Sequence, residues 1–224
     1  MSISEVFAAG GIVMVPLLLF SILAIALTVE RLAFWIRVNR RQQRVVKDIL
    51  RTYRHTPSEA FPKLKQNVDL PIARIFLEAL ELEGASPNQF RLALESATQA
   101  ELPLLRRFGT VFQTIITVSP LLGLLGTVLG LIHSFSAIRI GEAGVNAEAV
   151  TGGISEALVS TAAGMVVAIY ALLFANLFRG LYKRQVALLQ EYGSQLEILY
   201  EWQHQAVRGE QPTKAEDVPY ARAR

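Results

Sequence analysis

Residues 114–135 read TIITVSPLLGLLGTVLGLIHSF, and residues 152–178 read GGISEALVSTAAGMVVAIYALLFANLF. Together these two stretches contain one Asp, Glu, Lys or Arg, which is Glu156. A third apolar run without charge extends from residue 6 to residue 29. Because about 20 helical residues cross a bilayer core about 30 Å thick, the three runs predict three transmembrane helices in an all-α membrane protein.

The first apolar run is expected to remain in the mature protein as a membrane helix. It lacks the basic start of a secretory signal peptide, since the first Lys or Arg of the chain is Arg31, and it is longer than a signal core. The chain has no cysteine, which excludes disulfides, thiol catalysis and cysteine metal sites. Since no Ser–His or paired-Asp arrangement is visible either, we predict no enzymatic activity, cofactor or metal.

Basic residues are distributed unevenly among the segments that the spans separate. Residues 31–107 carry 14 Lys and Arg, residues 179–224 carry 7, and the loop 139–148 carries one. By the positive-inside rule, the two basic segments lie in the cytoplasm, whereas the N-terminus and the loop lie outside. The same bias accounts for the net charge of +3, and no nucleic-acid partner is predicted.

These assignments divide the chain into seven segments. They are an outer N-terminus with transmembrane helix 1 (1–36), a cytoplasmic helical segment (37–107), transmembrane helix 2 (108–138), an outer loop (139–149), transmembrane helix 3 (150–178), a cytoplasmic helical extension (179–207) and a disordered tail (208–224).

The cytoplasmic segments are predicted to be long helical extensions of the spans. Ser86-Pro87-Asn88-Gln89 is typical of a helix start, because Ser86 and Gln89 form a capping box and Pro87 occupies the first helical position. No strong stop follows before Arg139, so span two is expected to be the outer part of one long helix. Pro103, which lacks a backbone donor, is the expected position of a kink.

Small residues form one stripe on span two and one stripe on span three. The stripe on span two contains Gly123, Thr127, Gly130 and Ser134, and the stripe on span three contains Gly153, Ala157, Ser160 and Gly164. Small residues allow membrane helices to approach closely, so helix packing alone could explain the glycines. The alternative is that the same faces line a polar route. A phosphate-binding loop is excluded, because GLLGTVLG has no following Lys and lies within the membrane.

Two titratable side chains lie within these spans. An acid at the bilayer centre costs roughly 2.5–3.5 kcal/mol on insertion scales, so Glu156 is expected either to face a cavity or partner, or to lie shallow, where the helix dipole favours an acid. His133, near the outer end of span two, is interpreted as incidental.

Residue counting places two hydroxyls at a similar depth. Thr127 lies 11 residues from Ile138 and Thr161 lies 13 residues from Glu148, which correspond to roughly 17 and 20 Å. Antiparallel spans would therefore bring the hydroxyls close together, in a polar band with Glu156. The spans contain no Asp, and a proton relay usually needs several titratable groups. If protons move here, a partner is expected to supply another carboxylate.

The second and third spans closely resemble the MotA/TolQ/ExbB proton-channel family. The motifs that carry the resemblance are SPLLGLLGTVLGLIHSF at 119–135 and ISEALVSTAAGM at 154–165. The three-span layout and the large first cytoplasmic segment are also similar. Within the family the chain is most similar to ExbB, with TolQ second, because MotA has four spans.

The resemblance implies a multi-pass protein of the bacterial inner membrane, with a periplasmic N-terminus, a periplasmic loop and a cytoplasmic C-terminus. It implies a homopentameric ring whose pore holds two copies of a single-span ExbD/TolR-like protein with a proton-accepting Asp. Proton flow would then drive a TonB-like or TolA-like protein. Carried over by position, Thr127, Thr161 and Glu156 correspond to the family's pore-lining polar residues, and Pro120 to the proline of the span-two motif. The pore face would also include Gly123, Gly130, Ser134, Ala157, Ser160 and Gly164.

One position departs from the family pattern, since the ExbB branch usually has a proline where this chain has Tyr170. Three functions are therefore compared. The first is an ExbB-like stator subunit that energises TonB-dependent transport, and the second is a TolQ-like subunit for envelope integrity and cell division. The third is a membrane scaffold or solute-transporter subunit without proton flow. Membrane lipids surround the protein in each case.

Overall fold

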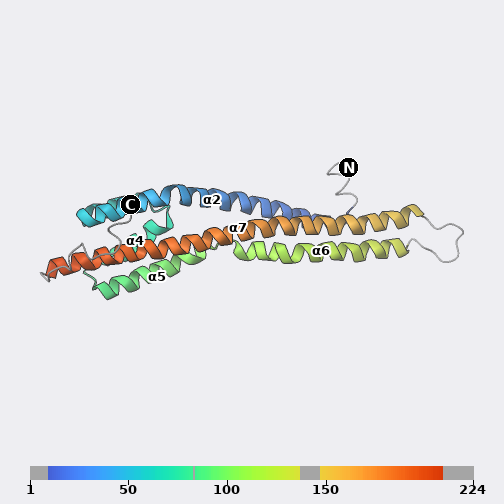
Figure 1. Ribbon diagram of the computed structural model, residues 1–224. Helices are drawn as coiled ribbons and strands as arrows, with labels where there is room; N and C mark the ends of the chain where they lie inside the picture. The colour runs from blue at the N-terminus through green and yellow to red at the C-terminus, as the bar shows by residue number, and fades with distance from the viewer. Residues whose placement is uncertain (1–9, 83, 137–146, 209–224) are drawn as a thin grey trace. The chain divides into compact units, whose positions relative to one another are not determined.

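The computed structural model describes residues 10–82, 84–136 and 147–208, without the side chains of 147–149 and 207–208. Its helices are α2 (Met14–His55), α3 (Pro57–Lys65), α4 (Pro71–Leu80), α5 (Pro87–Leu105), α6 (Gly109–Ser136) and α7 (Ala147–Arg208). No strand occurs in the described residues (Figure 1). Three helical stretches, 14–55, 87–136 and 150–206, are long and apolar enough to cross a membrane. The predicted all-α, three-span class is therefore confirmed.

The chain forms two compact units. The first, which we call the apolar unit, comprises Met1–Phe34 and Arg107–Gly180, and the second, the polar unit, comprises Trp35–Arg106 and Leu181–Arg224, each as far as its residues are described. Because α2 and α7 are continuous helices, each contributes residues to both units. The first and third spans thus continue as helices beyond their apolar runs, as predicted.

The expected single long helix from residue 87 to 139 is interrupted. α5 ends at Leu105, α6 begins at Gly109, and Phe108 between them has a φ of 65°. A left-handed residue other than glycine costs roughly 1–2 kcal/mol and cannot continue a right-handed helix. Pro103 lies inside α5, so the break follows the proline rather than occurring as a kink at it. Arg107 stacks on the Phe108 ring with its guanidinium carbon 4.5 Å from the centroid.

The polar unit is organised around α4 and α5. The capping box predicted for the start of α5 is present, with the Ser86 amide donating to Gln89 at 2.8 Å. Arg74 of α4 donates two hydrogen bonds, of 2.6 and 2.8 Å, to the buried carboxylate of Glu101 on α5. This bidentate pair raises the pKa of Arg74 above its usual value. The pair fixes α4 against α5.

α7 contributes polar and aromatic contacts to the same unit. The Tyr200 ring stacks on Phe90 with centroids 3.9 Å apart, and its hydroxyl donates to the Ala85 carbonyl at 2.8 Å. Gln185 donates to Gln42 of α2 at 2.7 Å, and both side chains are buried. Almost all of the predicted outer loop lies outside the described residues. The predicted disordered tail also lies outside them from residue 209 on.

Candidate functional site

The two small-residue stripes pack against each other in the apolar unit, where α6 runs beside the first half of α7 (Figure 1). A Cβ atom on Gly130 would lie 2.5 Å from the Gly153 carbonyl oxygen, and one on Gly164 would lie 2.5 Å from the Ser119 carbonyl oxygen. A Cβ atom on Gly123 would lie 3.0 Å from the Ser160 carbonyl oxygen. These contacts leave no room for side chains, so the stripes support close helix packing.

Hydroxyl groups satisfy backbone carbonyls along this contact. Thr161 donates to the Gly123 carbonyl across the two helices at 3.0 Å. Ser134 donates to the Val150 carbonyl at 3.1 Å, again from α6 to α7. Ser160, which is fully buried, donates to the Ala157 carbonyl of its own helix at 2.9 Å. Polar atoms in an apolar medium need such partners, and here they also connect α6 to α7.

The hydroxyls of Thr127 and Thr161 donate to different backbone carbonyls. Thr127, which is half-buried, donates to the Leu124 carbonyl of its own helix at 2.6 Å. Thr161 instead bonds to Gly123, which precedes Thr127 by one helical turn, or about 5.4 Å.

Pro120 lies inside α6, next to the fully buried Ser119. The Ser119 hydroxyl has no hydrogen-bond partner within the described part of the chain. Its carbonyl oxygen faces Gly164, as described above. The proline of the motif therefore lies next to the residue of α6 that contacts Gly164 of α7.

Glu156 lies where three segments of the apolar unit meet. Its carboxylate is 3.6 Å from Nδ1 of His133 on α6, and its side chain is 23% exposed. Gly11, just before α2, has a φ of +67°, and a Cβ atom there would overlap the Glu156 carboxylate. We call Gly11, His133 and Glu156 the Glu156 cluster. His133 was interpreted as incidental from the sequence, and the structure places its Nδ1 beside this acid.

The position of Glu156 along α7 bears on the alternative that this acid lies near the helix start, where the helix dipole favours it. α7 begins at Ala147, so Glu156 lies nine residues inside the helix, beyond the first turn, where the dipole effect has decayed. The spacing of His133 along α6 could have indicated its contact with α7, since Ser134 belongs to the small-residue stripe. No sequence signal identified Gly11, because its role depends on a turn outside both motifs.

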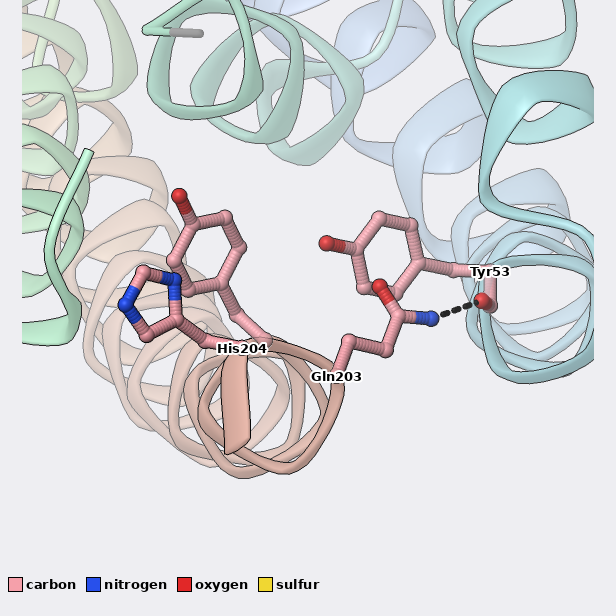
Figure 2. Close-up of a pocket in the computed structure, with 4 residues that line it drawn as sticks. Tyr53, Gln203 and His204 are labelled. Carbon is pink, nitrogen blue, oxygen red and sulfur yellow. Dashed lines mark hydrogen bonds between the residues drawn. The ribbon is translucent and has the colours of Figure 1, made fainter. Parts of the chain in front are cut away.

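A second candidate lies in the polar unit, where Tyr53, Tyr200, Gln203 and His204 line a cavity of about 160 Å³ (Figure 2). Gln203 donates to the Tyr53 carbonyl at 2.7 Å across it. The lining contains no acid, Lys or Arg. Nowhere in the described residues do three His, Cys, Asp or Glu side chains gather in a way that could hold a metal. The cavity therefore offers aromatic, imidazole and amide groups, and among the described residues no set of metal ligands.

Comparison with known proteins identifies relatives of the chain. Residues 67–191 match the MotA/TolQ/ExbB proton channel family. An ExbB-like biopolymer transport protein of Synechocystis sp. is 67% identical over 86% of this chain and 92% of its own length. The biopolymer transport protein ExbB of Neisseria meningitidis is 32% identical over 79% of this chain and 86% of its own length. The Tol-Pal system protein TolQ of Haemophilus influenzae is 33% identical over 54% of this chain and 51% of its own length.

Proposed function

Because the chain belongs to the MotA/TolQ/ExbB proton channel family, we propose that it is the stator subunit of an ExbB-like motor that is driven by the proton-motive force. The observation that carries the proposal is Glu156, the only acid between residues 150 and 178, which is partly buried among three segments of the apolar unit. An intramembrane carboxylate is costly and usually belongs to an ion or proton pathway.

In this proposal the proton route follows the polar face that α6 and α7 share. Thr161 and Glu156 supply polar groups near the helix contact, and Thr127 supplies a hydroxyl on a half-buried face of α6. A partly exposed hydroxyl on an apolar span is better accommodated by water, a second subunit or a partner helix than by lipid. This supports a pore wall built from several copies, for which we propose a homopentamer.

The route would be incomplete without a partner. Between residues 10 and 29 and between 108 and 136 the described chain contains no Asp or Glu, and between Val150 and Phe178 the only one is Glu156. We propose that two copies of a single-span ExbD/TolR-like protein enter the ring and supply the missing carboxylate. The complex would lie in the bacterial inner membrane with the N-terminus outside and the polar unit in the cytoplasm, where the basic residues concentrate.

A second candidate is a TolQ-like subunit for envelope integrity and cell division. It is favoured by the similarity to the Haemophilus influenzae protein named TolQ, which covers about half of either chain. The higher identity of the Synechocystis relative and the larger coverage of both ExbB-named relatives favour the first candidate. The two differ in the driven partner, TonB-like or TolA-like, and would share the same proton route.

Proton flux through reconstituted vesicles tests the proposal. The chain is co-expressed with a single-span protein that carries one membrane Asp and is encoded next to it, and the complex is placed in vesicles that contain a pH-sensitive dye. We expect flux from the complex and its loss in Thr161→Val and Glu156→Gln, whereas Thr161→Ser retains it because the hydroxyl remains.

Thr98→Val is the matched control for these variants. Thr98 lies on α5 in the polar unit and also donates to a carbonyl, that of Leu94 at 2.7 Å, so its substitution removes a comparable hydrogen bond outside the spans. We expect it to conduct normally. If Thr161→Val and Glu156→Gln both assemble and conduct like the unmodified complex, the pore assignment is wrong. If no neighbouring frame encodes such a protein, a scaffold or transporter subunit is favoured instead.

A further inference from the structure

We propose that His133 is a second protonatable residue of this pathway, which pairs with Glu156 and positions its carboxylate. The role in proton movement rests on the proposed function, whereas the pairing itself does not. The carboxylate oxygen of Glu156 lies 3.6 Å from Nδ1 of His133. At this distance a protonated imidazole attracts the carboxylate directly, and a small movement or one water molecule would complete a hydrogen bond.

The position of His133 on α6 suits a contact with an acid. His133 lies in the last turn of α6, where the negative end of the helix dipole stabilises a cation. Its side chain is 73% exposed within the chain, so it can exchange protons with its surroundings, whereas Glu156 is largely covered. The pair thus joins an accessible base to a covered acid.

No other described charge competes for this pair. His133 is the only titratable side chain of α6, and the part of α2 packed in the apolar unit is uncharged before Glu30. On α7, no other acid or base lies between Val150 and Phe178 except Tyr170, fourteen residues away. Outside the described side chains, the sequence has Glu5, Arg139, Glu142 and Glu148 in the neighbouring segments.

Gly11 completes the arrangement on the third side. Its left-handed backbone leaves the space that the Glu156 carboxylate occupies, so a side chain at this position would displace the acid. With Gly11 on one side and His133 on the other, the carboxylate has a defined position. His133 is then a positioning residue for Glu156.

Carbodiimide labelling of the isolated full chain tests the pairing without a partner or proton flow. Dicyclohexylcarbodiimide reacts with protonated carboxyl groups, and Glu156→Gln provides the background labelling. Between about pH 5 and 6, where histidine is largely protonated, we expect Glu156 to label about two- to fivefold faster in His133→Gln than in the unmodified chain, the range for a partly exposed ion pair. His133→Lys, which retains the positive charge, should label slowly.

Two glycine variants distinguish an effect of the position of the Glu156 carboxylate on labelling from an effect of backbone strain. Gly11 and Gly84 have similar φ values of +67° and +70°, but a Cβ atom on Gly84 would contact nothing within 4 Å. Both alanine substitutions therefore have a similar free-energy cost for the left-handed backbone conformation. We expect faster labelling in Gly11→Ala, because the carboxylate moves away from His133, and unchanged labelling in Gly84→Ala.

Proton flux then links the pair to the pathway. In the vesicle assay, flux through His133→Gln is expected to lose its dependence on external pH between about 5.5 and 7.5, around the ordinary titration range of histidine. Equal labelling of His133→Gln, His133→Lys and the unmodified chain overturns the proposal, whether or not the complex conducts. Altered labelling without flux in any variant supports the pairing and refutes the proposed function.

Discussion

Substitution of Gly164 by alanine tests whether close packing holds α6 against α7. In a helix, Gly→Ala stabilises by roughly 0.5–1 kcal/mol when the new methyl group has room. At Gly164 the methyl group would lie 2.5 Å from the Ser119 carbonyl oxygen and 3.2 Å from the Gly123 Cα, and both atoms belong to the backbone. Overpacking of this kind costs about 1–3 kcal/mol. The net effect should be destabilising, by about 1 kcal/mol.

The same helix provides matched controls for this prediction. A Cβ atom on Gly152 or Gly180 of α7 would meet nothing within 4 Å. We therefore expect Gly180→Ala to stabilise the chain by roughly 0.5–1 kcal/mol, and Gly152→Ala by less because it lies near the start of the helix. The sign of the change should thus differ between Gly164 and Gly180.

Fluorescence energy transfer between α6 and α7 measures the effect directly. The chain has no cysteine, so cysteines at the exposed positions Val128 and Leu158 can carry a donor and an acceptor dye. Separation of the helices is followed during denaturation in mixed micelles, and the free energy of unfolding is compared among the variants. If Gly164→Ala is as stable as Gly180→Ala or more so, close backbone contact at Gly164 does not hold the pair together.

Two further predictions concern the polar unit. Ser86→Ala removes the cap of α5 and should destabilise its first turn by about 1 kcal/mol, whereas Ser86→Asp retains a capping group; hydrogen exchange of the first-turn amides measures both. Glu101→Gln leaves Arg74 without its buried carboxylate and should cost about 2 kcal/mol in denaturant unfolding. Asp69→Asn, which breaks an exposed pair with Arg41, should cost less than about 1 kcal/mol, and equal losses would contradict the role assigned to burial.

The features that depend on local pattern could be predicted from the sequence. Uninterrupted apolar runs defined the spans, and the spacing of small residues identified the faces on which Gly123 and Gly164 pack. The capping box at Ser86 needs only residues three positions apart, and it is present.

The features that depend on tertiary contacts could not be predicted. The hydrogen bond from Thr161 to the Gly123 carbonyl depends on how α6 and α7 pack along their whole contact. Phe108 adopts a left-handed conformation that no propensity favours, so the break between α5 and α6 had no local signal. The contact between His133 and Glu156 joins segments whose offset is unknown until α6 and α7 are docked.

The hydrogen bond between Gln42 and Gln185 has a consequence for how the protein is made. The two residues are 143 positions apart, and Tyr53 and Gln203 are 150 apart. At a synthesis rate of about 5–20 residues per second, α2 emerges roughly 7–30 s before its partner on α7 exists. During that interval Gln42, which becomes buried in the finished chain, has no α7 to bond with. The nascent polar unit therefore depends on water or a chaperone to cover this surface until translation is almost complete.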